Sequence, residues 1–170
     1  MRRVRSLCAL IATAALFAAC GGGTDQTEME REIQNALSSD LAPIPVAAVD
    51  CPEDVVFDPE SVFPCSAEVD GSYFEVQVTI LDAQGRWEYE RRHAVLNVVN
   101  TELILQNDLS VALGFDVTAD CGDSENLVVS VGNTFLCRLS RINGGAARDI
   151  EVQVKSADQA IEWSLMPSLG

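Results

Sequence analysis

The chain shows two kinds of hydrophobic spacing, which together predict its elements. Apolar residues recur at every fourth position in two stretches, as Met29, Ile33, Leu37 and Leu41 and later as Leu105, Leu109 and Leu113. Positions four apart share one face of a helix, so each stretch predicts an amphipathic helix that packs on a sheet. Thr27 and Glu30 form a capping-box pattern at the start of the first helix. Asn97 or Asn100 can cap the second helix, and Gly114 stands where a left-handed residue often ends one.

Runs of strand-forming residues follow each predicted helix. They are residues 46–50, 62–69, 73–81 and 86–91 in the first half, and 115–119, 134–142, 149–155 and 161–165 in the second. In residues 73–81 apolar and polar side chains alternate, which predicts a strand with one buried face. Asp70-Gly71 and Asn143-Gly144-Gly145 are hairpin signals, so the strands are expected to be antiparallel. Between the two series, the segment that begins at Arg92 and His93 is expected to be an exposed connector.

The same motifs occur in the same order in both halves. Glu-Val-Gln-Val occupies residues 75–78 and again 151–154, and Trp87 or Trp163 follows nine positions after its last valine. A Gln-Asn motif in the helix and a pair of cysteines precede each copy. We therefore predict an α+β protein of two tandem repeats, residues 27–92 and 97–167. Each repeat is expected to pack one helix on an antiparallel sheet of about four strands, with one internal disulfide.

The N-terminal segment has the pattern of an export signal. Arg2, Arg3 and Arg5 precede an apolar run, residues 7–18, that is too short to span a bilayer. Residues 16–20, Leu-Phe-Ala-Ala-Cys, resemble the lipobox of bacterial lipoproteins, although Phe17 stands where leucine is usual. This resemblance implies a signal peptide at residues 1–19, acylation (palmitate) of Cys20, and a membrane-anchored protein at the outer face of the cytoplasmic membrane. Residues 20–26 are then a flexible linker, and ordinary cleavage after Cys20 is the alternative.

Four cysteines remain beyond this segment, an even number in a chain expected to be exported. That composition favours disulfides. Because each repeat should close its own loop, the expected pairs are Cys51–Cys65 and Cys121–Cys137. Zinc sites use closely spaced cysteine pairs, which these positions lack, so no metal is expected.

The net charge of the chain limits the kinds of molecule that it is expected to bind. The chain has 11 basic and 26 acidic residues and a formal net charge of −15. Such a surface repels nucleic acid and anionic lipid headgroups, so we exclude DNA or RNA binding. The acidity indicates a solvated exterior, with an acidic interface for a basic partner as the more specific alternative.

Several motifs together resemble the DUF4333 family of small secreted domains from actinobacteria. They are Cys51-Pro52, the Phe-x-Cys motif at residues 63–65, the Asp-Gly turn, the Val-x-Val strand and Gly85-Arg86-Trp87. The second half matches less fully, because Gly122 replaces the proline. The resemblance implies an exported cell-envelope protein and brings no catalytic residues.

Candidate chemistry is sparse. The chain has one histidine, and the nucleophile, phosphate-binding and zinc-protease motifs are missing from it. Asp120, Asp123 and Glu125 cluster beside a cysteine but lack the spacing of a calcium loop. The two tryptophans could form a ligand platform, although core packing is the expected role.

We therefore expect a protein-interaction module of the cell envelope without catalytic residues, cofactor or metal. A carrier or sensor of a small envelope-derived ligand is the alternative, and the sequence does not indicate which residues would bind the ligand. A hydrolase that uses a carboxylate pair is a weaker one.

Overall fold

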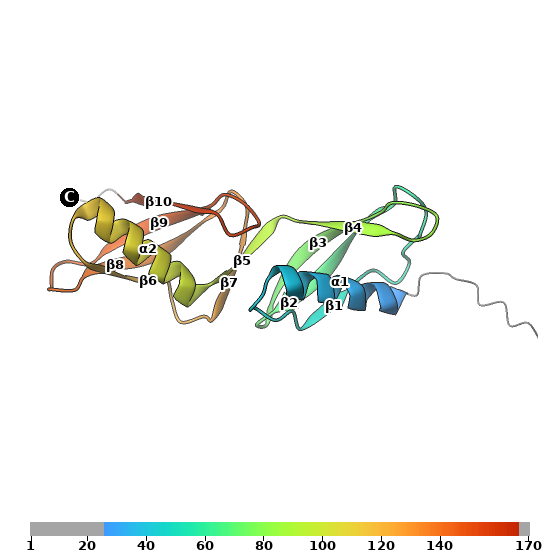
Figure 1. Ribbon diagram of the computed structural model, residues 1–170, viewed down its shortest axis with the longest axis horizontal. Coiled ribbons are helices and arrows are strands. Elements are labelled where there is room, and N and C mark those ends of the chain that lie inside the picture. The colour runs from blue at the N-terminus through green and yellow to red at the C-terminus, as the bar shows by residue number, and fades with distance from the viewer. Residues whose placement is uncertain (1–25, 167–170) are drawn as a thin grey trace, which may run out of the picture.

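The computed structural model describes residues 26–166 and twice places a helix against a four-stranded antiparallel sheet (Figure 1). The N-terminal lobe contains α1 (Gln26–Asp40), β1 (Ala48–Asp50), β2 (Val62–Val69), β3 (Ser72–Ile80) and β4 (Trp87–Arg91). The C-terminal lobe contains α2 (Val98–Leu113), β6 (Val117–Asp120), β8 (Thr134–Arg141), β9 (Arg148–Val154) and β10 (Ile161–Leu165). The neighbours run β1-β2-β3-β4 in one sheet and β6-β8-β9-β10 in the other. The predicted α+β class is confirmed.

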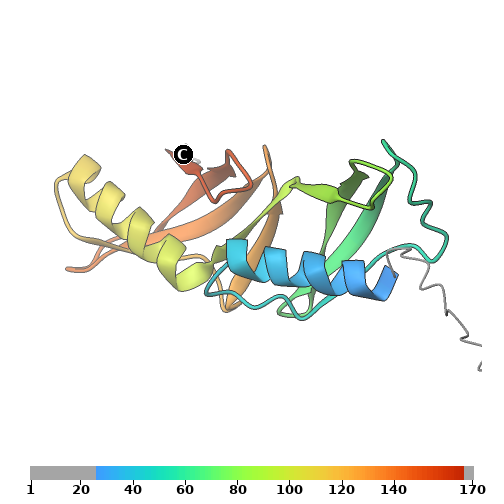
Figure 2. The same ribbon diagram turned by 45° about the vertical axis from the view of Figure 1, so that its right-hand side comes forward.

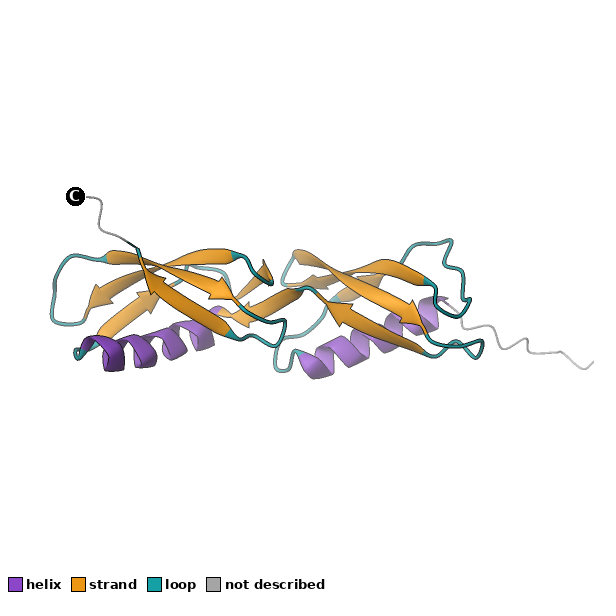
Figure 3. Ribbon diagram, turned by 90° about the horizontal axis from the view of Figure 1, so that it is seen from above, coloured by secondary structure: helices purple, strands orange, loops and turns teal. Residues whose placement is uncertain are grey.

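The two lobes lie end to end, with both helices on the same side of the molecule (Figure 3). The predicted stripe of α1 is buried in the N-terminal lobe, where Met29, Ile33 and Leu37 have no exposed surface. Phe74, Val76, Val78 and Ile80 of β3 meet it from the sheet. Because side chains of a strand alternate between its faces, the polar residues between them point to solvent.

The ends of α2 are as predicted, whereas the start of α1 is different. The side chain of Asn97 accepts the backbone N–H of Asn100, and Gly114 adopts φ 73° beyond the last turn. The capping-box prediction for α1 is wrong, since the helix begins at Gln26 and Thr27 lies inside it. The carboxylate of Glu30 instead accepts the backbone N–H of Cys51 at 2.9 Å. The side chain of Glu30 therefore makes a tertiary hydrogen bond in place of the predicted helix cap.

Both predicted disulfides are present, Cys51–Cys65 and Cys121–Cys137. In the C-terminal lobe the carboxylate of Glu102 accepts the backbone N–H of Cys121 at 2.8 Å, as Glu30 does for Cys51. Each lobe thus joins its helix to the first cysteine by a charged hydrogen bond, and that cysteine to the central strand by a disulfide. A charged acceptor makes such a bond stronger than a neutral one.

The repeated tetrapeptide does not occupy equivalent positions in the two sheets. Cys65 lies opposite Val76, whereas Cys137 lies opposite Ile150, so the second tetrapeptide is displaced by two residues along its strand. The tryptophans are displaced as well, because Trp87 pairs with Ile80 and Trp163 with Val152. An even shift keeps every side chain on its face of the sheet, so the valines remain buried in both lobes.

The expectation of an exposed connector after β4 is wrong. Residues after Arg92 form β5 (His93–Asn97), which pairs with β7 (Asn126–Ser130) in a two-stranded ribbon between the lobes (Figure 2). Val95 of β5 belongs to the core of the N-terminal lobe, while Ala94 and Leu96 pack on the other side with Val154. The strand was missed because both of its faces are buried, which leaves no alternation to detect.

Prediction from the first disulfide. We expect the double substitution Cys51→Ala and Cys65→Ala to lower the free energy of unfolding by about 3 kcal/mol, because the bond closes a loop of 14 residues. Urea unfolding of the variant and the parent protein measures this difference. An unchanged free energy would contradict a stabilising role.

Prediction from β5. We expect Val95→Ala to lower the free energy of unfolding by about 2 kcal/mol, because the side chain is fully buried against the N-terminal lobe. Val56→Ala is the matched control, since that valine is 60% exposed, and its effect should stay within about 0.5 kcal/mol. Equal effects of the two substitutions in urea unfolding would show that the ribbon does not hold the lobes.

Candidate interaction surface

The outward face of α2 carries four exposed apolar residues beside the exposed polar residues Asn100 and Asn107. The four are Val99, Leu103, Ile104 and Val111, which are exposed by 61%, 52%, 50% and 86%. We call these four residues the α2 apolar face. They lie opposite the buried side of the helix, which carries Leu105 and Leu109. Single exposed apolar residues are ordinary on a protein surface, but four on one helix are typical of a contact surface.

The same positions of α1 carry polar side chains. Leu105 and Leu109 occupy in α2 the places that Ile33 and Leu37 occupy in α1, facing the core of their lobe. Counted from these pairs, the outward positions of α1 are Thr27, Arg31, Glu32 and Ser39. The apolar character is therefore not a requirement of the fold, because an otherwise similar helix packs on its sheet without it.

Although the chain as a whole is acidic, α2 itself carries few charged residues. Its only charged residues are Glu102, which bonds to the backbone of Cys121, and Asp108. On α1, by contrast, Arg31 lies 3.7 Å from Glu28 and the Nε1 of Trp87 donates to Glu32 at 3.3 Å. An apolar partner can therefore approach α2 without first displacing ion pairs.

His93, the single histidine of the chain, lies at the junction of the lobes and not in an exposed connector. Its ring centroid is 6.2 Å from that of Phe74. Its Nδ1 is buried and has no hydrogen-bond partner among residues 26–166. This environment packs the imidazole between strands and gives it no carboxylate to orient it.

The two tryptophans lie in separate lobes. Each is half-buried and packs against the core of its own lobe. Trp87 also contacts Tyr89, with ring centroids 6.2 Å apart, on the side of β4 that faces α1 and the core. The structure therefore does not bring Trp87 and Trp163 together as one platform.

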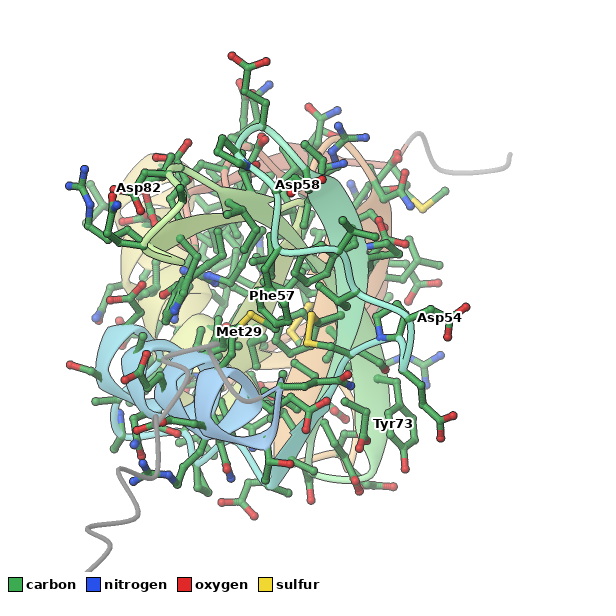
Figure 4. All side chains as sticks on the ribbon, turned by 90° about the vertical axis from the view of Figure 1, so that its right-hand side faces the viewer. Met29, Asp54, Phe57, Asp58, Tyr73 and Asp82 are labelled. Atoms are coloured by element: carbon green, nitrogen blue, oxygen red, sulfur yellow. A yellow bond between two sulfur atoms is a disulfide. The ribbon has the colours of Figure 1, made fainter. Side chains whose placement is uncertain are left out.

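Two of the three acidic residues near Cys121 make hydrogen bonds of different kinds. The carboxylate of Asp120 accepts the backbone N–H of Gly122 in the local loop, whereas the backbone carbonyl of Glu125 accepts the backbone N–H of Val98 at the start of α2. In the described part of the chain, no three His, Cys, Asp or Glu side chains are grouped to hold a metal ion. At the far end of the N-terminal lobe Asp54 and Asp58 point outward from their loop, while Met29 and Phe57 point inward (Figure 4). The carboxylate of Asp82 accepts the backbone N–H groups of Gln84 and Arg86 in its own loop.

The proposed lipidation site, Cys20, lies outside the described residues, as do the signal peptide and most of the linker. Within residues 26–166 neither helix has the length and apolar character needed to cross a bilayer.

Tyr89 ties the sheet of the N-terminal lobe to the C-terminal end of α1. Its hydroxyl donates to the carboxylate of Asp40. Partial burial, together with this carboxylate, raises the pKa of Tyr89 to about 12. The pKa of Tyr73 is also raised, chiefly by the charge of Glu68.

The fold and the exposed helix define a small, disulfide-bonded α+β protein with a candidate interaction surface on α2. Residues 10–85 match the family model described as "Domain of unknown function (DUF4333)". The matched residues include Cys20, α1, the first disulfide and β1 to β3. No curated protein and no solved structure matches the chain.

Prediction from Tyr89. In a spectroscopic titration of the Tyr73→Phe variant, the remaining tyrosine should ionise near pH 12. Because the folded-state pKa is raised, the contact stabilises the protein fully below about pH 10 and loses this contribution as the pH rises towards 12. Asp40→Asn should lower the pKa of Tyr89. Ionisation at the ordinary pKa in the Tyr73→Phe protein would contradict the contact.

Proposed function

We propose that the protein is a non-catalytic, membrane-anchored lipoprotein of the cell envelope whose α2 apolar face binds a protein partner. The observation that carries this proposal is the contrast between the helices. Where α1 presents Thr27, Arg31, Glu32 and Ser39 to solvent, α2 presents Val99, Leu103, Ile104 and Val111. Apolar residues exposed to water at such positions bring no stability to the lobe, so binding is the better explanation for them.

Anchoring is supported by the leader and by the family match. The basic, apolar and lipobox-like segments lie in the order that export and acylation require. The DUF4333 match begins at residue 10, inside the apolar run, and continues through Cys20. The family match therefore spans both the N-terminal leader segment and the first folded lobe. Disulfides in both lobes suit an oxidising compartment outside the cytoplasm.

The two lobes support an origin by tandem duplication. They share the strand order, a disulfide from the first strand region to the second strand of the sheet, and the helix carboxylate on the first cysteine. On this proposal the second copy kept the fold and changed its outward helix face. Duplication frees one copy in this way, because the other copy retains the original surface.

Prediction for the interaction. A photo-crosslinking residue placed at position 103 of the full-length chain should give protein adducts in the cells that produce it. The same residue at position 31, the equivalent outward position of α1, is the matched control. The variant Val99→Thr, Leu103→Arg, Ile104→Glu and Val111→Ser, which copies the α1 face onto α2, should compete about tenfold less well for the crosslinked partner.

Adducts at position 103 with another protein, or with a second copy of the chain, support the proposal. Adducts with lipid alone would show that α2 faces the membrane and would overturn it. Equal yields at positions 103 and 31 would overturn it as well. Circular dichroism of the four-residue variant checks that the fold is retained.

A further inference from the structure

The C-terminal lobe has a pocket beside the C-terminal end of α2, where Leu113 and Phe115 line it. This end of α2 lies at the end of the molecule farthest from α1 (Figure 1). The volume of the pocket is about 390 Å³, within the range of small-molecule sites. Its lining combines apolar side chains with two exposed arginines. The lining includes Leu113, Phe115, Val117, Leu139, Arg141 and Arg148.

The corresponding end of the N-terminal lobe is filled by core side chains. Arg141 follows Cys137 at the distance at which Val69 follows Cys65, and both positions face the helix. Arg148 stands two residues before the strand partner of Cys137, as Phe74 stands two residues before that of Cys65. Val69 and Phe74 are 1% and 3% exposed. Two arginines thus replace two buried apolar residues on the inward face of the sheet.

The connection from helix to sheet also differs between the lobes. Between α1 and β1 a loop brings Ile44 and Val46 into the core, whereas only residues 114–116 join α2 to β6. The β5–β7 ribbon then covers that end of the N-terminal lobe, where His93 meets Phe74 and Val128 packs against the core. In the described part of the chain nothing equivalent covers the pocket.

The charges of the two arginines are not neutralised. Within residues 26–166 neither Arg141 nor Arg148 has a carboxylate within 4.0 Å, whereas Arg138 on the opposite face of β8 pairs with Asp149. The guanidinium of Arg141 instead lies 3.7 Å from the centroid of the Phe115 ring. In a chain of net charge −15 this leaves two cationic side chains beside the apolar side chains of the pocket. Guanidinium groups bind carboxylates and phosphates through paired N–H donors.

We infer that this pocket binds a small amphiphile with one anionic head, a carboxylate or phosphate, and a compact apolar body. Arg141 and Arg148 hold the head. Leu113, Val117 and Leu139 take up the apolar body. This site is independent of the α2 apolar face, because the two surfaces share no residue.

The inference is tested by NMR titration of a soluble form, residues 24–170, which contains all the described residues and both disulfides. The probes are octanoate and octyl phosphate, with neutral octan-1-ol and with acetate as controls for the head and the apolar body. We expect saturable binding of at least one anionic probe, with amide shifts that cluster around Phe115 and Leu139. Octan-1-ol and acetate should bind at least about tenfold more weakly.

The double substitution Arg141→Gln and Arg148→Gln should weaken binding of the anionic probe about tenfold or more, since it removes both charges and keeps the side-chain length. Arg138→Gln, on the outer face of the same strand, is the matched control and should leave the affinity unchanged. The inference is overturned if neither anionic probe binds saturably, if the double variant binds as well as the parent protein, or if Arg138→Gln weakens binding equally. None of these outcomes depends on the photo-crosslinking at α2.

Discussion

The arrangement of the two lobes depends on the burial of β5 on both of its faces. This strand continues β4 with a break only at Arg92 and leads directly into α2 (Figure 2). Val95 completes the core of one lobe, and Leu96 on the other face packs towards the second. One five-residue strand therefore fixes the end of the first sheet, the start of the second helix and the distance between them. Because fully buried apolar side chains cannot be exposed without cost, the lobes are not free to separate at this point.

Each lobe also has an internal connection that does not depend on β5. Glu30 and Glu102 hold the first cysteine of each disulfide by its backbone N–H, and the disulfide holds the central strand. The helix is thereby attached to its sheet at one end by polar contacts and along its length by apolar packing. Two independent kinds of contact explain how the outward faces of the helices can diverge while the helices keep their place.

Periodic patterns in the sequence were sufficient for the elements with one buried face. The stripe of α1 and the alternation in β3 each have a solvent side, so the spacing of their apolar residues carries the prediction. β5 and β7 have little or no solvent side, and the sequence shows only a short apolar run. The sequence also did not predict the contact of Glu30 with Cys51. Thr27 and Glu30 match a local capping box, whereas Cys51 is distant from Glu30 in the chain. The α2 apolar face could have been found by comparing outward positions between the repeats.

The displaced tetrapeptide shows why identical residues can mislead an alignment while the fold stays the same. Strand faces repeat every two residues, so a shift of two preserves burial and only changes which residues lie opposite one another. The disulfide and the helix carboxylate cannot shift in this way, because each requires a particular pair of residues. Equivalence between the lobes should therefore be judged from Glu30, Cys51 and Cys65 and their counterparts. By this comparison, Arg141 and Arg148 occupy the positions of Val69 and Phe74. The open end of the second lobe therefore carries two charged side chains where the closed end of the first lobe carries two apolar ones.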